Sequence, residues 1–485
     1  MQVNKHLYIN GKWYIGEGVR RQIINPSDET VITEINEASK KQTYAAVEAA
    51  SYALQNTDWA FNVTKRVAAL HQLADLLEQS AEEFAYIETL NTGKPIRESR
   101  LDVSDSIHCL RYYADFVKNR TLWEKEMHDG TTSRVFEEPI GVCALIVPWN
   151  FPLLLGTWKI APALAAGNTI IFKPSELTPL SLINFTKLIE ASDIPPGVFN
   201  LVLGGGYPVG ETLITHPHVD KVSFTGGTET GRWINQQCAN HFKRVSLELG
   251  GKSPLIVLED AELDIAVEWA IFSSFFNQGE VCVASSRILV HECLYDRFIE
   301  KLIEKLDHLR IDDPLDERTE MGPLISAAHR KKIETYIDIG LHEGAVLLRG
   351  GERIKEKGYY LSPAVFVNIH QSMRIVQEEI FGPVITIQRF KNDQEAIEWA
   401  NGTAYGLAAG VLSREVERAE RIAEKLRAGT VWINSYHTPY VEAPWGGFKQ
   451  SGIGRELGPQ GFTAFTETKH VNISRKLKPL GWYQC

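Results

Sequence analysis

Apolar residues repeat along this chain with two different spacings, and each spacing predicts a different kind of element. Between residues 41 and 118 the apolar positions recur at helical spacing, for example at Val67, Leu70, Leu73, Ala74 and Leu77. From residue 139 onward, short apolar runs typical of strands alternate with helical segments: VCALIVP, a helix over 155–166, NTIIFKP, a helix over 179–191, NLVLGG and DKVSFTGG. This alternation predicts βαβ units around a parallel sheet.

A second alternating series begins near residue 250. Its members are SPLIVLE, a helix over 261–275, SSRILVHE, an amphipathic helix over 293–308, AVLLRGG, PVITIQRF, a helix over 393–401 and GTVWINS. Two such series predict two α/β domains joined near residue 250. Outside them, the Asn10-Gly11 pair within LYINGKW predicts a hairpin. We interpret TKHVNISR, near the C-terminal end, as an edge strand that reaches another subunit.

Composition and charge narrow the class of protein. The 485 residues are 44% hydrophobic and 23% charged, which is ordinary globular composition and excludes a disordered or collagen-like chain. The net charge of −10, without a long basic run, argues against nucleic acid or an anionic membrane as a partner. The first residues lack the features of a signal peptide, and the apolar stretch at 141–156 is too short to span a bilayer. We therefore expect a soluble, cytoplasmic protein.

The six cysteines predict neither a metal site nor a disulfide framework, because none forms a CxxC and no pair has zinc-finger spacing: Cys109, Cys143, Cys238, Cys282, Cys293 and Cys485. Cys282 differs from the others, since it follows the polar run NQGE between an apolar helix and a strand. Gly279 in that run allows the backbone to approach closely. A free cysteine is more often a small buried hydrophobe than a nucleophile, so this segment alone leaves both interpretations open.

Two further segments carry candidate catalytic groups. Glu248 lies between two leucines just before Gly250-Gly251; the segment alone favours a solvent-facing residue on an edge strand. In a partly apolar cleft, however, its pKa would rise and it could act as a general base. Asn150 lies in VPWNFP, a turn made rigid by flanking prolines at the end of a strand. It is either an ordinary turn residue or a donor to a developing oxyanion.

A nucleotide-binding pocket is suggested by two strand ends. Lys173 and Glu176 follow a strand in IIFKPSE, and SFTGGTETG places Gly226-Gly227 before a helix that starts near Thr228. Backbone N–H groups at such a helix start can receive a pyrophosphate. A complete G-x-G-x-x-G is missing, and glycine is common in strand-to-helix turns for geometric reasons, so each segment alone is weak evidence.

Taken together, the motifs resemble one family. In chain order they are PWNFP, KPSE, FTGGTETG, LELGGKSP, NQGEVCVASSR, EEIFGP and PWGGFKQSGIGRELG. In this order and at these spacings the chain resembles the NAD(P)-dependent aldehyde dehydrogenase superfamily over nearly its whole length. Its C-terminal segment is most similar to bacterial betaine aldehyde dehydrogenases.

The resemblance implies an α/β fold with a Rossmann-like NAD-binding domain, a second α/β catalytic domain and a small β oligomerisation element. The corresponding ranges are 1–118 and 139–249 for the NAD-binding domain, 250–448 for the catalytic domain, 119–138 and 468–485 for the oligomerisation element, and 449–467 for a C-terminal return segment. It also implies a homodimer or homotetramer.

The resemblance further implies a catalytic role for each of three residues. Cys282 matches the nucleophile, whose thiolate attacks the aldehyde carbon and then carries a thioester. Asn150 and the backbone N–H of Cys282 match the oxyanion hole. Glu248 matches the base that activates the water that hydrolyses the thioester.

Cofactor contacts are implied in the same way, with NAD as the cofactor. Lys173 and Glu176 match the residues at the adenosine ribose, and a carboxylate there would repel a 2′-phosphate, which favours NAD over NADP. The remaining cofactor residues are Trp149, Gly226, Gly227, Glu379 and Phe381. Two departures stand out: Gly227 replaces a common serine, and Glu280 replaces the usual glutamine. We expect Glu280 to raise the pKa of the Cys282 thiol.

For the substrate, Phe151, Trp158, Phe276 and Trp445 match an aromatic box that holds the trimethylammonium group in betaine aldehyde dehydrogenases. Aromatic faces attract a quaternary ammonium by cation–π contact. Betaine aldehyde or a related aminoaldehyde is the expected substrate, and a broad range of aliphatic or aromatic aldehydes is the alternative. A CoA-acylating relative is disfavoured by Glu248, and a non-catalytic homologue by the presence of Cys282, Glu248 and Asn150.

Overall fold

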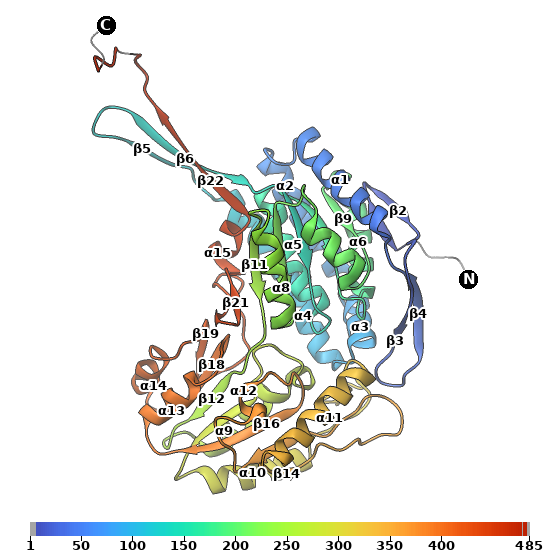
Figure 1. The fold of residues 1–485 in the computed structure, drawn as a ribbon, viewed down its shortest axis with the longest axis vertical. Coiled ribbons are helices and arrows are strands. Elements are labelled where there is room, and N and C mark those ends of the chain that lie inside the picture. The colour runs from blue at the N-terminus through green and yellow to red at the C-terminus, as the bar shows by residue number, and fades with distance from the viewer. Residues whose placement is uncertain (1–5, 478, 483–485) are drawn as a thin grey trace.

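The structure is a computed structural model that describes residues 6–477 and 479–482, so that Cys485 lies outside the described part. Two α/β lobes lie one above the other, and a β arm projects from the upper lobe (Figure 1). The family-derived expectation of two α/β units with a small β element is therefore confirmed.

The upper lobe is built on an eight-stranded sheet in the order β2-β1-β9-β8-β7-β10-β11-β21. Its strands are β1 (Leu7–Ile9), β2 (Lys12–Tyr14), β7 (Val142–Ile146), β8 (Thr169–Lys173), β9 (Phe199–Leu201), β10 (Lys221–Thr225), β11 (Arg244–Glu248) and β21 (Gly452–Ile453). The hairpin predicted at Asn10-Gly11 joins β1 to β2 and is confirmed.

Five strands of this sheet run parallel, and their order explains where a ligand can bind. From β9 through β8, β7 and β10 to β11, every neighbouring pair is parallel. Along the chain β7 comes first, then β8 and β9 on one side and β10 and β11 on the other. The strand order therefore reverses between β7 and β10, and ligands of open α/β sheets bind at the carboxyl ends of the strands at such a point.

Helices pack around this sheet: α1 (Lys40–Asn56), α2 (Val63–Gln79), α3 (Ala81–Thr92), α4 (Ile96–Lys118), α5 (Pro152–Ala166), α6 (Leu180–Ala191), α7 (Glu211–Thr215) and α8 (Thr228–Ala239), with a π-helical turn η1 (Gly206–Gly210) before α7. Helix α5 begins earlier than the predicted residue 155, because Pro152 suits the first helical turn. It is buried along its whole length, so it forms the centre of the lobe rather than a surface layer.

The lower lobe is built on a seven-stranded sheet in the order β14-β15-β16-β13-β12-β18-β19. The strands are β12 (Pro254–Val257), β13 (Arg287–His291), β14 (Val346–Arg349), β15 (Ala364–Val367), β16 (Val384–Phe390), β18 (Ala408–Leu412) and β19 (Thr430–Ile433). Its helices are α9 (Leu263–Phe275), η2 (Phe276–Gly279), α10 (Tyr295–Asp307), α11 (Ala327–His342), α12 (Arg374–Gln377), α13 (Asp393–Asn401) and α14 (Val416–Ala423). All neighbouring strands are parallel except β14, which pairs antiparallel with β15. The sequence pattern did not predict α11, β15 or β18.

The projecting arm is a three-stranded antiparallel sheet in the order β22-β6-β5. Its strands are β5 (Trp123–Glu126), β6 (Thr132–Pro139) and β22 (Thr466–Ile473), so TKHVNISR does form an edge strand. Between the lower lobe and β22 the chain passes back along the upper lobe through β21 and α15 (Gly458–Thr463). Two small sheets pair β3 (Arg20–Ile24) with β4 (Val31–Asn36) and β17 (Tyr405–Gly406) with β20 (Phe448–Lys449).

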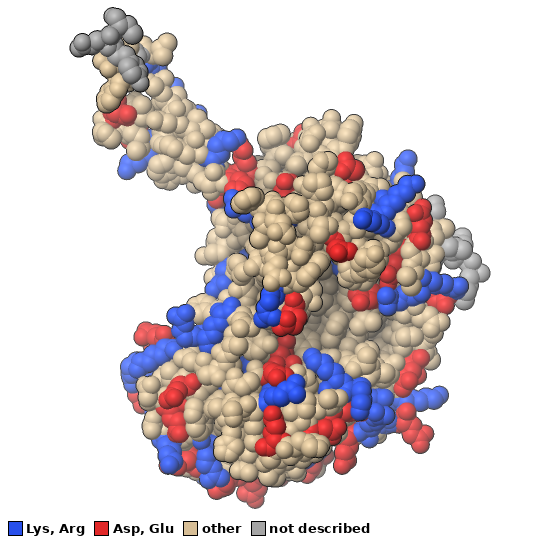
Figure 2. All heavy atoms as spheres, viewed as in Figure 1, with Lys and Arg blue, Asp and Glu red and all other residues tan. Residues whose placement is uncertain are grey.

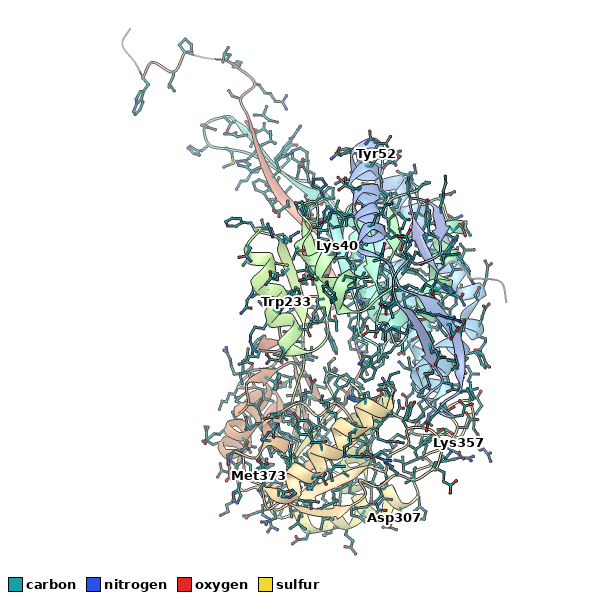
Figure 3. All side chains as sticks on the ribbon, turned by 45° about the vertical axis from the view of Figure 1, so that its right-hand side comes forward. Lys40, Tyr52, Trp233, Asp307, Lys357 and Met373 are labelled. Atoms are coloured by element: carbon teal, nitrogen blue, oxygen red, sulfur yellow. The ribbon has the colours of Figure 1, made fainter. Side chains whose placement is uncertain are left out.

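Charged side chains of both signs are interspersed over the visible surface and are dense on the lower lobe (Figure 2). In the turned view, Trp233 of α8 lies in the upper lobe and Asp307 and Met373 in the lower one (Figure 3). Within the described ranges, none of the helices combines the length and the apolar character needed to cross a bilayer.

Candidate active site

Two cavities meet at Cys282. One, of about 310 Å³, is lined mainly by apolar and aromatic side chains. The other, of about 220 Å³, lies at the carboxyl ends of β7 and β10, where the strand order reverses. Residues that line both cavities mark their junction: Leu155, Thr225, Glu248, Leu249 and Cys282. The Cys282 thiol and the Glu248 carboxyl group therefore lie at the junction of the two cavities.

Cys282 is held by a loop with an unusual backbone, residues 276–282, which we call the nucleophile loop. Asn277, Gln278 and Gly279 have φ values of 47°, 57° and 72°, so three consecutive residues are left-handed. Only glycine adopts this conformation without cost, so the two other residues must be held by contacts elsewhere. At Gly279, a Cβ would lie 2.7 Å from the backbone of Gly382, which explains why glycine stands there.

The thiol of Cys282 lies in a poorly solvated place. Burial raises its pKa to about 12, and the nearby carboxyl groups of Glu379 and Glu248 contribute in the same direction. That Glu280 raises this pKa stays a prediction, because the largest contributions come from burial and from Glu379 and Glu248. The Glu280 side chain accepts the backbone N–H of Ile325 at 3.0 Å and lies 3.6 Å from His329 Nε2, and it is not among the main causes of the raised thiol pKa.

Glu248 is the last residue of β11, and the interpretation of a solvent-facing edge residue is wrong. It is only 4% exposed, because β10 flanks β11 on one side and β21 of the return segment covers the other. Neither carboxyl oxygen has a hydrogen-bond partner within the described part of the chain. Burial, and next the charge of Glu456, raise its pKa well above the ordinary value. Glu456 is itself paired with the buried Lys159.

Asn150 lies between β7 and α5 and lines the smaller cavity, which Cys282 also lines. Its Nδ2 donates to the carbonyl oxygen of Glu280 at 2.8 Å, and its Oδ1 is buried and has no partner among the described residues. An amide nitrogen has two hydrogens, so one N–H remains for an oxygen bound next to the thiol.

The smaller cavity contains most of the predicted cofactor residues: Trp149, Gly226, Gly227, Glu379 and Phe381. Helix α8 starts here without a side-chain cap, and a Cβ on Gly227 would meet nothing within 4 Å. Space and free N–H groups thus coincide at a helix N-terminus, as phosphate binding requires. Glu379 Oε1 accepts the N–H of Gly251 at 2.9 Å.

Lys173 and Glu176 lie apart from that cavity, at the carboxyl end of β8. Lys173 Nζ donates to the carbonyl oxygens of Pro174 and Gly204 at 2.9 and 2.7 Å. A Cβ on Gly205 would lie 3.9 Å from Glu176 Oε1, so this carboxylate faces the glycine-rich turn before η1. His329 and Lys332 of α11 also line the smaller cavity. The sequence did not point to them, because it did not predict α11 itself.

The larger cavity contains all four predicted substrate residues. Phe151 and Phe276 stack with ring centroids 6.4 Å apart, and Trp158 and Trp445 meet edge to face at 5.4 Å. Among the lining residues that the sequence did not point to are Asp102, Asp105, Phe272 and His437. Asp105 is a half-buried carboxyl group whose pKa is raised to about 6, chiefly by burial and next by Asp102.

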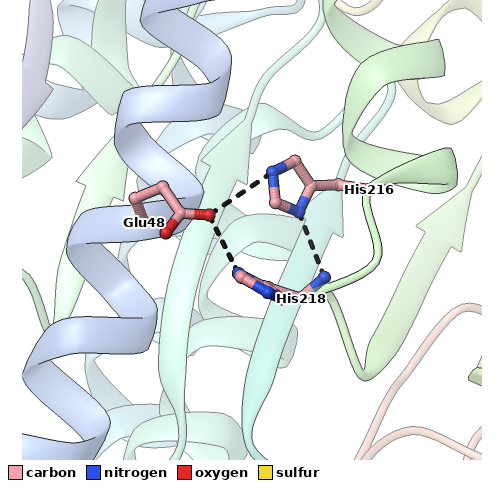
Figure 4. Close-up of side chains that lie close together, drawn as sticks. All are labelled: Glu48, His216 and His218. Carbon is pink, nitrogen blue, oxygen red and sulfur yellow. Dashed lines mark hydrogen bonds and ion pairs between the residues drawn. The ribbon is translucent and has the colours of Figure 1, made fainter.

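A separate group of ligating side chains lies between α1 and the turn before β10 (Figure 4). Glu48 Oε1 is 2.9 Å from His218 Nδ1 and 3.7 Å from His216 Nε2. The backbone N–H of His218 donates to His216 Nδ1 at 3.1 Å, so the proton of the neutral ring sits on Nε2. A ring nitrogen that carries a proton has no lone pair for a metal. We therefore interpret this group as a polar contact that joins α1 to the turn. The expectation that the protein uses no metal stays a prediction.

Comparison with known proteins identifies the class. The model of the aldehyde dehydrogenase family matches residues 13–471. Betaine aldehyde dehydrogenase of Bacillus subtilis is 43% identical over 99% of this chain and its own whole length, and pea peroxisomal aminoaldehyde dehydrogenase 1 is 41% identical over 99% and 98% of the two chains. The chain therefore belongs to the aldehyde dehydrogenase family, which confirms the resemblance and the expectation of an aldehyde-oxidising enzyme.

Comparison with solved structures leads to the same family. Betaine aldehyde dehydrogenase of Staphylococcus aureus in complex with NAD⁺ has a TM-score of 0.97 at 41% identity, over 100% of this chain and 98% of that one. At this level of agreement the whole fold is shared.

Proposed function

We propose that this protein oxidises an aldehyde to the carboxylate with NAD, and that its substrate is betaine aldehyde or a related aminoaldehyde. The observation that carries the proposal is the junction of the two cavities at Cys282, beside Glu248. An aldehyde in the aromatic cavity and a nicotinamide in the other would meet at one thiol. The NAD complex of the Staphylococcus relative supports the cofactor.

Cys282 acts first as nucleophile. Its thiolate adds to the aldehyde carbon, and the negative charge moves to the aldehyde oxygen. The free N–H of the Asn150 amide and the backbone N–H of Cys282 stabilise that oxygen; one such donor is worth about 3 kcal/mol, or roughly 100-fold in rate. Because burial raises the pKa of Cys282 to about 12, the thiol is protonated at neutral pH, and it has to release its proton to solvent before the thiolate can attack.

NAD, when bound, supplies the acceptor for the hydride that leaves the former aldehyde carbon. Glu248 then has to remove a proton from the water that attacks the thioester. Its carboxyl oxygens have no other partner among the described residues, and its raised pKa makes the carboxylate a stronger proton acceptor than an ordinary one. The retained carboxyl group disfavours a CoA-acylating reaction, in which no water has to be activated.

The cofactor residues fit NAD. The open space at Gly227 and the uncapped start of α8 would accept the pyrophosphate, and Glu379 and Phe381 would hold the nicotinamide ribose. Lys173 and Glu176 would contact the adenosine ribose. A 2′-phosphate next to Glu176 would be repelled, which favours NAD over NADP.

The larger cavity supports a cationic substrate. Its aromatic walls match the needs of a quaternary ammonium, which cannot donate hydrogen bonds. Asp105 adds a negative charge to the same cavity above about pH 6. The mainly apolar lining also supports the second candidate, a dehydrogenase of uncharged aliphatic or aromatic aldehydes.

A panel of kcat/KM values with NAD tests the proposal. Betaine aldehyde, aminoaldehydes and plain aliphatic aldehydes are compared in the wild-type enzyme and in Cys282→Ala. We expect the cationic aldehydes to be preferred, and Cys282→Ala to lose NADH formation while still binding NAD. A preference for uncharged aldehydes selects the second candidate, and turnover by Cys282→Ala refutes the role of the thiol.

The ranges given above for the NAD-binding, catalytic and oligomerisation parts remain proposals, as does a homodimer or homotetramer. The projecting arm supports the oligomer, because β5 at its edge has a free side and Trp123 is 51% exposed. A cytoplasmic location is supported by the mechanism, which needs a reduced thiol.

A further inference from the structure

The side chain of Glu98 in α4 is hydrogen-bonded to the backbone of the nucleophile loop. It is 4% exposed, and its Oε2 accepts the backbone N–H of Asn277 at 2.9 Å, although the two residues are 179 positions apart in the chain. Asn277 is 1% exposed and left-handed, so this N–H lies out of reach of bulk water. Without Glu98 a buried donor would lose its acceptor at the point where the backbone is strained.

Asn277 is also hydrogen-bonded to Asn150, the proposed oxyanion donor. Its Nδ2 donates to the carbonyl oxygen of Asn150 at 3.1 Å. The side chain of Asn150 in turn donates to the carbonyl oxygen of Glu280, two residues before the thiol. A continuous series of hydrogen bonds therefore connects α4, the Asn150 amide and the backbone next to Cys282.

The buried ionisable residues Lys94 and Asp102 lie close to Glu98. Lys94 is fully buried, its Nζ pairs with Asp102 at 2.5 Å, and it lies 3.9 Å from the centre of the Phe151 ring. Burial raises the pKa of Glu98 to about 8, and the charge of Lys94 acts against this rise. A carbonyl-type oxygen remains available to the N–H of Asn277 in either protonation state, so the acceptor atom matters here rather than the charge.

We propose that Glu98 is a positioning residue of this enzyme. Its oxygen fixes the backbone of Asn277, and through Asn277 it holds the Asn150 amide and the Cys282 thiol in the arrangement that attack on the aldehyde needs. The inference rests on the catalytic roles of Cys282 and Asn150 proposed above.

The test compares two substitutions of Glu98 with one matched control. Glu98→Gln keeps an acceptor oxygen at nearly the same place, whereas Glu98→Leu removes it at similar size. Glu88→Leu is the control, because Glu88 is also buried beside this group but makes no hydrogen bond to the nucleophile loop. For each full-length variant the NADH burst in a single turnover, alkylation of Cys282 by iodoacetamide, the Kd for NAD and Tm are measured.

We expect Glu98→Leu to lower the burst rate by about 10–100-fold, as a displacement of about an ångström does, and to change the alkylation rate while the Kd for NAD stays the same. Glu98→Gln should stay close to the wild type. Glu88→Leu should leave the burst rate unchanged, because both carboxyl oxygens of Glu88 are buried without a hydrogen-bond partner among the described residues.

The inference is overturned if Glu98→Leu keeps its burst, if Glu88→Leu loses as much, or if Glu98→Gln fails to restore the rate. Should Glu98→Leu not fold, Asn277→Asp tests the next contact, because it replaces the donor to Asn150 by an acceptor. An unchanged burst in that variant also refutes the inference. Failure of the wild type to form NADH from any aldehyde refutes the proposed function instead.

Discussion

Trp445 offers the sharpest test of how the larger cavity selects its substrate. The residue is 8% exposed, lines the cavity and meets Trp158 edge to face at 5.4 Å. The change considered is Trp445→Leu, which keeps the wall apolar but removes the aromatic face. Two substrates are compared in each enzyme: betaine aldehyde and its uncharged isostere, in which carbon replaces the quaternary nitrogen.

The expected magnitude follows from what the two substrates share. Loss of apolar contact area affects both equally, since their shapes are the same, so it cancels in the ratio of their kcat/KM values. The cation–π contribution affects betaine aldehyde alone. A desolvated aromatic face is worth about 1–2 kcal/mol to a cation, which corresponds to a fall of about 5–30-fold in the ratio.

Initial rates of NADH formation at saturating NAD give both kcat/KM values. Tm of the variant shows whether the cavity is still folded. Equal losses for the two substrates would refute the reasoning, because the aromatic wall would then act through its size alone.

Three other outcomes follow from the site. Glu248→Gln should keep the NADH burst and slow steady-state turnover by about 100-fold or more, since only thioester hydrolysis needs the base; loss of the burst would contradict this role. Asp105 is ionised above its raised pKa of about 6, so KM for betaine aldehyde should rise by up to about 5-fold as pH falls through about 6. The uncharged isostere, or Asp105→Asn, should show no such rise. Glu280→Gln should leave the pH profile of Cys282 alkylation nearly unchanged, because Glu280 accepts the N–H of Ile325 and the main causes of the raised thiol pKa are burial, Glu379 and Glu248; a clearly lower thiol pKa in this variant would disprove that account.

Local pattern was enough to predict much of the upper lobe. The apolar runs at 142–146, 169–173 and 221–225 form β7, β8 and β10, and the helix expected near Thr228 is α8. These strands are buried on both faces, so they appear in the sequence as continuous apolar runs. The elements of the lower lobe were harder to predict from the sequence pattern. β18 is the run AAGVL, whose small residues carry little strand signal, and α11 has a buried face of few residues.

The order of the motifs was sufficient to single out Cys282, Glu248 and Asn150, but not to describe their surroundings. Glu248 is polar and lies beside two leucines, so its segment alone suggested exposure; burial came from β21, which begins some two hundred residues further along the chain. The carboxyl groups that contribute most to the raised pKa of Cys282 are likewise Glu379 and Glu248, from distant segments.

The residues proposed to react thus lie in short motifs of the chain, because each proposed role needs a particular residue type in a particular turn. Their solvation, pKa and alignment depend on which segments pack around them. Glu98, Asp105, His329 and Lys332 belong to helices that are unremarkable by themselves and gain their contacts only when α4 and α11 close around the nucleophile loop. Burial and hydrogen bonding are properties of that closed arrangement, so no local window of the sequence contains them.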